Sequence, residues 1–306
     1  MIDLNIKKLA EDIKSIKIQG ASNIEQESIK GIEKYILKTN KNGQDFLNEL
    51  TENIQELISQ RPNEPKLRNS MNYILKKANE YKYELDKTKL LQDIKNYHEQ
   101  IQKNNTKISE LASKLITNGS KILTHCHSTL VENAFKKAKD AGIDFEVFCT
   151  ETRPLFQGRI TAKNLCEYGI KTTMLIDSEI THILKSVDFF FTGADVVFSD
   201  GSIMNKVGTT AISMCAQKYN TPHIVLTPTH CCETNELFNI NQQIEERDPN
   251  EIWEKENRPP TLNIKNPAFD IVPNELIDKF ITEEGVFSPE TLYLWVNKYK
   301  LGKEKT

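Results

Sequence analysis

The feature that most constrains the fold of this chain is a change in its sequence pattern near residue 118. The residues before it contain few of the glycines and prolines that interrupt secondary structure, and their apolar side chains recur at helical spacing. From residue 119 onward, short runs typical of β-strands alternate with stretches typical of helices. Such a chain is expected to fold as a helical domain over residues 1–117 and an α/β domain over residues 118–306.

The first part is predicted to be a helical bundle. Ile74, Ala78 and Tyr81 return at steps of four and three residues, which puts them on one face of a helix. Asn23 is expected to cap a helix, because its short polar side chain can accept a hydrogen bond from a free backbone N–H. Pro65 suits the first turn of another helix, where no backbone donor is needed.

The second part is predicted to be a Rossmann-like, mostly parallel sheet flanked by helices. Strands alternating with helices indicate βαβ units, and these place the strands side by side in one direction. Ligands on such sheets collect at the carboxyl ends of the strands. The strands are expected at residues 121–125, 144–150, 171–177, 188–195 and 223–227.

Composition excludes several classes of function. The net charge is −3, from 40 basic and 43 acidic residues, so there is no basic surplus to indicate direct nucleic-acid binding. The chain contains no run of about 18 apolar residues, so no membrane span is predicted. The N-terminal segment lacks the apolar core of a signal peptide, so we expect a cytoplasmic protein with reduced thiols. Cys149, Cys166 and Cys215 are expected to be small buried side chains.

Chemically active side chains stand at the ends of the predicted strands. Cys126 follows the first strand, Arg153 the second, Asp177 the third and Asp195 the fourth. Because the carboxyl ends of neighbouring parallel strands meet at one edge of a sheet, this thiol, the carboxylates and the guanidinium are expected to lie close together.

A phosphate site is predicted after Asp195. There a tight turn is expected to deliver Asn205 and Lys206 just ahead of Gly208 and a helix. The free backbone N–H groups of a helix start, with the Lys206 ammonium, can hold a phosphate. Neither GxxxxGK[ST] nor GxGxxG occurs in the chain, which argues against a nucleotide-binding P-loop and against a dinucleotide site.

Five ordered motifs carry a resemblance to a known family. They read ILTHCHS at 122–128, TETRPLFQGRITA at 150–162, GADVVFSDGSIMNKVGT at 193–209, IEERDP at 244–249 and NPAFDIVPNELIDKFITEEGV at 266–286. Together they resemble the superfamily of translation initiation factor 2B alpha, beta and delta subunits. That superfamily also contains methylthioribose-1-phosphate isomerase and archaeal ribose-1,5-bisphosphate isomerase. The resemblance spans roughly residues 12 to 290.

The resemblance implies roles for particular residues. In the isomerases, the cysteine of the THC motif and the aspartate of the GAD motif are the catalytic pair, which match Cys126 and Asp195. A sugar with phosphate on C1 cannot open its ring through a free hemiacetal. A thiol that protonates the ring oxygen and a carboxylate that relays a proton suit this chemistry. No cofactor is required. The implied substrate contacts are Gly20, Ala21, Arg61, Arg153, Gln157, Asn205 and Lys206, and Ser128 is expected either to hold phosphate or to cap the next helix.

Two departures from the isomerase pattern leave two functions open. Gln19 stands where isomerases commonly have arginine, and residues 228–232 lack the lysine typical of ribose-bisphosphate isomerases. One function is isomerisation of ribose 1,5-bisphosphate to ribulose 1,5-bisphosphate, with methylthioribose 1-phosphate as the rival substrate. The other is a regulatory subunit that binds a translation initiation factor and senses a sugar phosphate or nucleotide. Regulatory alpha subunits usually lack the cysteine, so Cys126 favours the enzyme. A homodimer or hexamer is implied by resemblance.

Structural roles are the alternative for each of these residues. Cys126 can be a packed core thiol, Asp195 can cap a turn, and Arg153 and Lys206 can be ordinary surface charges. The HCH run at 125–127 and the HCC run at 230–232 suggest zinc. Adjacent strand residues point to opposite faces, however, and the second run lacks CxxC spacing, so no metal is predicted.

Overall fold

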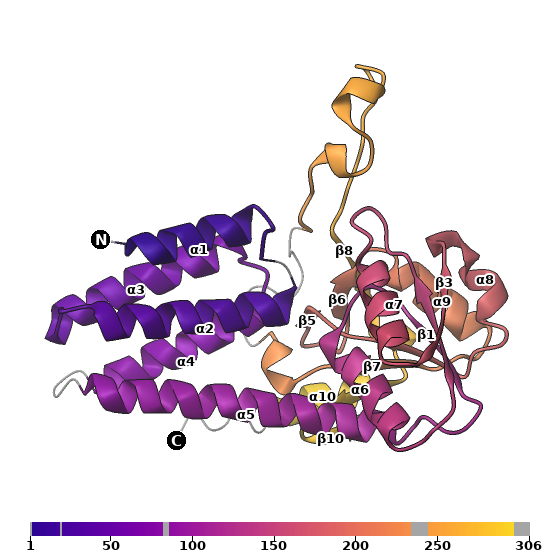
Figure 1. Ribbon diagram of the computed structural model, residues 1–306, viewed down its shortest axis with the longest axis horizontal. Helices are drawn as coiled ribbons and strands as arrows, with labels where there is room; N and C mark the ends of the chain where they lie inside the picture. Colours follow the sequence, from indigo (N-terminus) through magenta and orange to yellow (C-terminus); the bar gives the residue numbers. More distant parts are fainter. Residues whose placement is uncertain (1, 19, 82–85, 234–243, 297–306) are drawn as a thin grey trace. The chain divides into compact units, whose positions relative to one another are not determined.

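The computed structural model describes residues 2–18, 20–81, 86–233 and 244–296. The chain divides into two compact units between Lys103 and Asn104, within a long helix (Figure 1). The last turns of that helix contribute Ile108 and Ala112 to the core of the second unit. The unit boundary therefore precedes the change in sequence pattern, which comes only after the helix ends at Ser113. No helix within the described ranges is long and apolar enough to cross a membrane.

The first unit is the predicted helical bundle. Its core contains fully buried side chains from several helices, among them Ile6, Ile32 and Phe46. Gly31 allows two of these helices to approach closely, since a Cβ at that position would lie 2.6 Å from Cδ2 of Leu9. The helices are α1 (Leu4–Lys14), α2 (Ala21–Lys38), α3 (Gly43–Gln60), α4 (Pro65–Glu80) and the first part of α5 (Lys87–Ser113).

The helix starts confirm one sequence prediction and correct another. Helix α4 begins at Pro65, as expected. The prediction that Asn23 caps a helix is wrong, because α2 begins at Ala21 and Gly20 is its N-cap. Gly20 adopts a left-handed conformation with φ +84°, and its carbonyl accepts hydrogen bonds from the N–H groups of Asn23 and Ile24. The glycine therefore starts the helix earlier than the polar side chain would.

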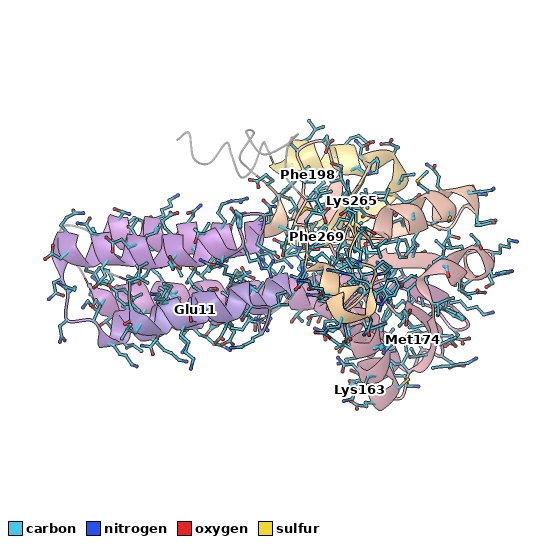
Figure 2. The ribbon with its side chains drawn as sticks, turned by 90° about the horizontal axis from the view of Figure 1, so that it is seen from above. Glu11, Lys163, Met174, Phe198, Lys265 and Phe269 are labelled. Atoms are coloured by element: carbon cyan, nitrogen blue, oxygen red, sulfur yellow. The ribbon has the colours of Figure 1, made fainter. Side chains whose placement is uncertain are left out.

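The second unit contains a seven-stranded sheet in the order β10-β9-β7-β4-β1-β2-β3. All neighbours pair in parallel except β10, which pairs antiparallel with β9. The five predicted strands are confirmed, and β9 and β10 were not anticipated. Met174 lies on the edge strand β3 and is exposed (Figure 2). The strands are β1 (Lys121–Thr124), β2 (Glu146–Thr150), β3 (Lys171–Leu175), β4 (Phe189–Thr192), β7 (His223–Leu226), β9 (Lys279–Thr282) and β10 (Gly285–Phe287).

Alternate strand residues build the cores on the two faces of this sheet. Ile122 and Phe191 pack with the end of α5, α6 and α7, whereas Leu123 and Phe190 pack with α8 and α9. This alternation follows from the period of two in a strand. The sheet is therefore covered by helices on both faces, as the Rossmann-like prediction requires. These helices are α6 (Thr129–Asp140), α7 (Gln157–Glu167), α8 (Ile180–Ile183) and α9 (Thr209–Lys218).

A second, antiparallel sheet has the order β5-β6-β8. Its strands are β5 (Val196–Val197), β6 (Ile203–Lys206) and β8 (Phe269–Val272). Phe198 and Phe269 pack with Val196 and Met204 on one side of it (Figure 2). As predicted, a tight turn with Gly201 at φ +83° delivers Asn205 and Lys206 ahead of a helix. Both residues belong to β6 and pair with β8, which was not anticipated.

The remaining segments are short helices and a long loop. Residues 244–268, drawn in orange in Figure 1, carry the charge-rich stretch, and Arg247 forms ion pairs with Glu245 and Glu251 at the base of this loop. Helix α10 covers Pro289–Val296. The 3-10 turns are Asp177–Glu179, Thr229–Cys231, Pro249–Glu251, Lys255–Asn257 and Asn274–Leu276.

All six cysteines are free thiols. Cys149 is buried as expected, but the prediction is wrong for Cys166, which is exposed, and Cys215 is only half-buried. Cys166 belongs to α7, whose inward face is formed by other residues such as Ala162 and Leu165.

Gly158 provides a test of how tightly α7 packs on the end of β2. A Cβ at this position would lie 1.8 Å from the carbonyl oxygen of Thr150. We expect Gly158→Ala to lower the free energy of unfolding by about 3 kcal/mol, because the backbone must move to relieve the clash. Gly169→Ala, on the same βαβ unit, is the control. Gly169 has φ +77° and open space around it, so a Cβ meets no neighbour and only the backbone conformation is unfavourable. Gly169→Ala should therefore lower the free energy of unfolding by about 1 kcal/mol. Urea denaturation measures both, and equal losses would contradict the packing argument.

Candidate functional site

The order of the strands defines where a ligand is expected. From the central strand β1 the chain passes to β2 and β3 on one side, then returns to β4 and β7 on the other. In open parallel sheets, ligands bind at the carboxyl ends of the two strands where the order reverses, here β1 and β4. The segments that follow these strands touch, because a Cβ on Gly193 would lie 2.8 Å from Oγ of Ser128. Residues 126–128 and 193–195 therefore meet at this reversal.

Cys126 is held in a left-handed turn directly after β1. Its φ is +68°, a conformation that costs a residue other than glycine of order 1–3 kcal/mol. Its N–H donates to Oγ1 of Thr152 at 2.9 Å, and its carbonyl accepts from Oγ1 of Thr161 at 3.0 Å. Both peptide groups of the cysteine are thus fixed by buried threonines from the neighbouring βαβ unit.

The segment after β2 is fixed by Asp177. Thr152 has φ +62°, which is rare for a β-branched residue. The Asp177 carboxylate accepts from the N–H of Thr152 at 2.8 Å and from the N–H of Arg153 at 2.7 Å. The peptide between Arg153 and Pro154 is cis. Asp177 therefore stabilises the turn that holds Cys126.

The electrostatics of the site favour a protonated thiol. Burial raises the pKa of Cys126 to about 11, although part of the residue remains accessible. The Lys206 ammonium opposes this rise in the pKa, and the carboxylates of Asp195 and Asp177 add to it. All three charges therefore act on the sulfur, which at neutral pH is a thiol that can donate a proton. The expectation that Cys126 and Asp195 form a catalytic pair stays a prediction.

Asp195 and Lys206 are positioned by the second sheet. The N–H of Asp195 donates to the carbonyl of Met204 at 3.0 Å. Lys206 ends β6, and its Nζ lies 5.5 Å from the ring centroid of Phe269. Asn205 is buried and donates from Nδ2 to Oγ1 of Thr209 at 3.1 Å. The amide of Asn205 thus ties β6 to the start of α9.

The start of α9 is occupied by a carboxylate. Asp270 accepts from the N–H groups of Gly208 at 2.9 Å and Thr210 at 3.2 Å. Burial raises the pKa of Asp270, and these two N–H donors oppose the rise. A residue from β8 thus already satisfies two of the backbone N–H groups at this helix start, and the expected phosphate contact stays a prediction.

Two predicted contact residues have side chains suited to a ligand. Ser128 is the N-cap residue of α6, but its hydroxyl makes no capping hydrogen bond and lies beside Gly193. This excludes the capping alternative. Gln157 begins α7, and its Oε1 is buried without a hydrogen-bond partner among the described residues. A buried acceptor of this kind is costly unless a ligand or water completes it.

Arg153 is engaged by the long loop. Its side chain is exposed, its guanidinium lies 5.0 Å from the ring centroid of Phe156, and Nη2 donates to the carbonyl of Ile252 at 3.2 Å. The structure therefore places the Arg153 backbone at the site and directs its guanidinium to residues of the loop. Its expected phosphate contact stays a prediction.

The predicted contacts from the helical part belong to the first unit. Gly20 and Ala21 form the start of α2, and Arg61 follows the end of α3. Gln19, which replaces the arginine of the isomerases, lies outside the residues that the structure describes. Their contact with a ligand likewise stays a prediction.

The two histidines that flank Cys126 have different partners. His125 is buried and bonds Thr150 at 2.6 Å and the carbonyl of Val207 at 3.0 Å. His127 bonds Thr161 at 3.1 Å, and its Nδ1 lies 3.6 Å from the Glu132 carboxylate. Among the described residues there is no group of three or more His, Cys, Asp or Glu side chains that could hold a metal ion.

Several residues that shape the site were not identified from the sequence. Thr150, Thr152 and Thr161 support the Cys126 turn, and Asp270 caps the helix that follows Lys206. The threonines carry a weak signal, since they lie within the TETRPLFQGRITA motif. Asp270 gives no such signal, because it bonds the N–H of Gly208, which lies 62 positions away in the sequence.

The fold is that of a doubly wound α/β protein, with a thiol, a carboxylate and an ammonium at the strand reversal as a candidate ligand site. Comparison with known proteins makes this assignment more specific. The chain belongs to the Initiation factor 2 subunit family, whose sequence profile matches residues 17–289. The family expected from the five motifs is thereby confirmed.

The chain is similar to enzymes and to a translation factor subunit. It is 35% identical to the ribose 1,5-bisphosphate isomerase of Methanocaldococcus jannaschii over 295 residues, covering 96% of this chain and 95% of that protein. It is 30% identical over 302 residues to the methylthioribose-1-phosphate isomerase of Heliobacterium modesticaldum, and the match covers 93% of this chain and 88% of that protein. The crystal structure of translation initiation factor eIF-2B, subunit delta, from A. fulgidus matches with a TM-score of 0.73 at 28% identity. The match covers 94% of this chain and 89% of that one.

The raised pKa of Cys126 predicts its reactivity. Alkylating agents attack the thiolate, so the rate at Cys126 should rise about tenfold per pH unit from pH 7 and level off only near the pKa of about 11. Iodoacetamide labelling, followed by mass spectrometry of the Cys126 peptide, measures this rate. A short unstructured peptide with the same sequence is the control, and its rate should level off near pH 9. A plateau below pH 9 for the folded protein would refute the desolvated thiol.

Proposed function

We propose that this protein is a sugar-phosphate isomerase that converts ribose 1,5-bisphosphate to ribulose 1,5-bisphosphate. One observation carries the proposal: a protonated Cys126 thiol at the strand reversal, within the fields of Asp195 and Lys206. The names of the relatives support it, since proteins matching more than nine-tenths of this chain are named ribose 1,5-bisphosphate isomerase.

The proposed reaction needs two proton transfers with the substrate, one hydrogen shift, and one proton transfer that restores the protein. Cys126 donates a proton to the ring oxygen, and the bond between that oxygen and C1 breaks. The hydrogen on C2 moves to C1, and the C2 hydroxyl loses its proton to give the ketone. Asp195 accepts that proton and returns it to the Cys126 thiolate, which restores the starting state. One proton is gained and one is lost, so the product is an isomer of the substrate and no cofactor is consumed.

Several residues are proposed to bind the substrate of this pair. The Lys206 ammonium supplies charge for a phosphate, and the Ser128 hydroxyl lies beside Gly193 without a capping role. The buried acceptor of Gln157 is suited to a sugar hydroxyl. Arg153, Asn205, Gly20, Ala21 and Arg61 complete the proposed contacts. We also propose a cytoplasmic homodimer or hexamer, by similarity to the family.

A regulatory subunit is the second candidate. The match to the subunit delta structure at 28% identity favours it, as does Gln19 in place of arginine. Such a protein would bind a translation initiation factor, and would bind a sugar phosphate or nucleotide without converting it. Methylthioribose 1-phosphate is the rival substrate for an enzyme, since a relative at 30% identity is named for it.

Turnover of ribose 1,5-bisphosphate tests the proposal. Phosphorus and carbon NMR should detect ribulose 1,5-bisphosphate with the wild-type protein. Cys126→Ser and Asp195→Asn should each lower kcat by about a thousandfold, because each loses a proton transfer, and both should remain folded and bind substrate.

Cys166→Ser is the matched control, since Cys166 is exposed on α7 and should leave turnover unchanged. Methylthioribose 1-phosphate is assayed in parallel, and faster conversion of it would reassign the substrate. If the wild-type protein converts neither sugar while either one raises its Tm, the regulatory function is supported instead. Unfolding of Cys126→Ser would indicate a packing role for the thiol.

A further inference from the structure

His125 connects the catalytic thiol with the segment that carries Lys206. It is 3% exposed, and both ring nitrogens are hydrogen-bonded. Nε2 bonds the carbonyl of Val207, the residue after Lys206, at 3.0 Å. Nδ1 bonds Oγ1 of Thr150, the last residue of β2, at 2.6 Å. One side chain therefore bridges the ends of β1, β2 and β6.

The direction of these hydrogen bonds is fixed by chemistry. The carbonyl of Val207 can only accept, so Nε2 of His125 must carry a proton. Burial lowers the pKa of His125, so the ring is neutral at neutral pH and Nδ1 is an acceptor. The hydroxyl of Thr150 must therefore donate to Nδ1.

The same reasoning extends to the backbone N–H of Cys126. Because the Thr150 proton points at His125, the hydroxyl of Thr152 donates toward Thr150, whose Oγ1 and carbonyl oxygen both lie 3.4 Å away. Thr152 Oγ1 then accepts the N–H of Cys126 at 2.9 Å. A chain of hydrogen bonds with a single direction runs from the Cys126 peptide to the Val207 carbonyl. Except for Thr152, whose hydroxyl can donate to Oγ1 or to the carbonyl oxygen of Thr150, each group in this series has only one arrangement of protons that satisfies its neighbours.

Gly208 shows how closely the far end is packed. Its φ is +103°, and a Cβ at this position would lie 3.2 Å from Nε2 of His125. The backbone just after Lys206 therefore approaches the imidazole as nearly as a residue without a side chain permits.

We propose that His125 is a positioning residue, which as the neutral Nε2–H tautomer holds the Cys126 turn and the Lys206 segment in register through Thr150 and Thr152. The isomerase role of the thiol rests on the proposed function, but the positioning itself does not. Loss of the bond between Thr150 and His125 leaves the Thr150 carbonyl oxygen as the one fixed acceptor for the Thr152 hydroxyl. The left-handed turn then relaxes, the sulfur becomes more hydrated, and its reactivity rises.

A structural histidine in the same sheet provides the comparison. His223 is 1% exposed and bonds Thr192 at 2.8 Å and Ser213 at 3.0 Å, so its burial and partners resemble those of His125. Within the described residues, neither partner is hydrogen-bonded to residues 126–128. A purely structural role for His125 predicts that the two histidines behave alike.

The test measures alkylation of Cys126 at pH 8 in folded variants. Thr150→Val keeps the shape of the side chain and removes the donor, and His125→Gln keeps a donor for Val207 and removes the acceptor. Each should raise the rate at Cys126 about tenfold, since the thiolate fraction rises tenfold when the pKa falls by about one unit. The charged groups that act on the sulfur, Lys206, Asp195 and Asp177, are unchanged.

Thr150→Ser restores the hydroxyl and should return the rate to within about threefold of wild type. His223→Gln should leave it unchanged within about twofold. In turnover assays, Thr150→Val and His125→Gln should lower kcat about tenfold with little change in KM, because the thiol is misplaced while the substrate contacts remain. Folded Thr150→Val protein with wild-type Cys126 reactivity would overturn the proposal, as would an equal effect of His223→Gln. If wild-type protein shows no turnover, the isomerase assignment fails, and the alkylation comparison alone decides the role of His125.

Discussion

The site depends on the two hydrogen bonds that hold the peptide groups of Cys126. A left-handed conformation at a residue other than glycine is unfavourable, and here Thr152 and Thr161 stabilise it from opposite sides. These threonines are themselves fixed, Thr152 by Asp177 and Thr161 by the packing of α7 on β2. The direction in which the sulfur points is thus a property of three neighbouring strand ends rather than of one loop.

The arrangement follows from the parallel sheet. In the central strands β1, β2, β4 and β7, side chains alternate between two apolar faces, so these strands are buried and their polar groups stand at the strand ends. Gly158 and Gly193 allow backbone and side chains to approach each other there. Desolvation at this edge keeps the thiol protonated, while the ammonium of Lys206 and the carboxylate of Asp195 act on it through a medium that screens them weakly.

The sequence predicted the parts of the structure that depend on local patterns. Helical spacing and β-prone runs identified the bundle and the first five strands of the main sheet, and the reversal rule placed Cys126 near Asp195. Contacts between distant segments were not predictable in this way. The strand status of Lys206 depends on pairing with Phe269, and the carboxylate at the start of α9 comes from Asp270. Gly201 marked the turn between β5 and β6, but no local pattern indicated that β6 would pair with β8.

The direction of a single side chain was equally beyond local rules. Arg153 follows a strand, as expected, yet its guanidinium donates to a carbonyl 99 residues away in the chain. Gly20 rather than Asn23 starts α2 because backbone conformation, not side-chain polarity, determined that start. The family motifs identified the site residues without these details, because a motif records which residues occur together and not what each one touches.

The chain leaves the large sheet at Thr192 and enters the small one at Val196, so Asp195 lies at the junction of the two. Lys206 belongs to the small sheet, whereas Cys126 belongs to the large one. The thiol and its two charged neighbours are therefore carried by separate sheets, which the bond from His125 to Val207 connects. A substitution that tilts the small sheet would move the carboxylate and the ammonium as a pair, and this bond would transmit part of the movement to the segment that carries the sulfur.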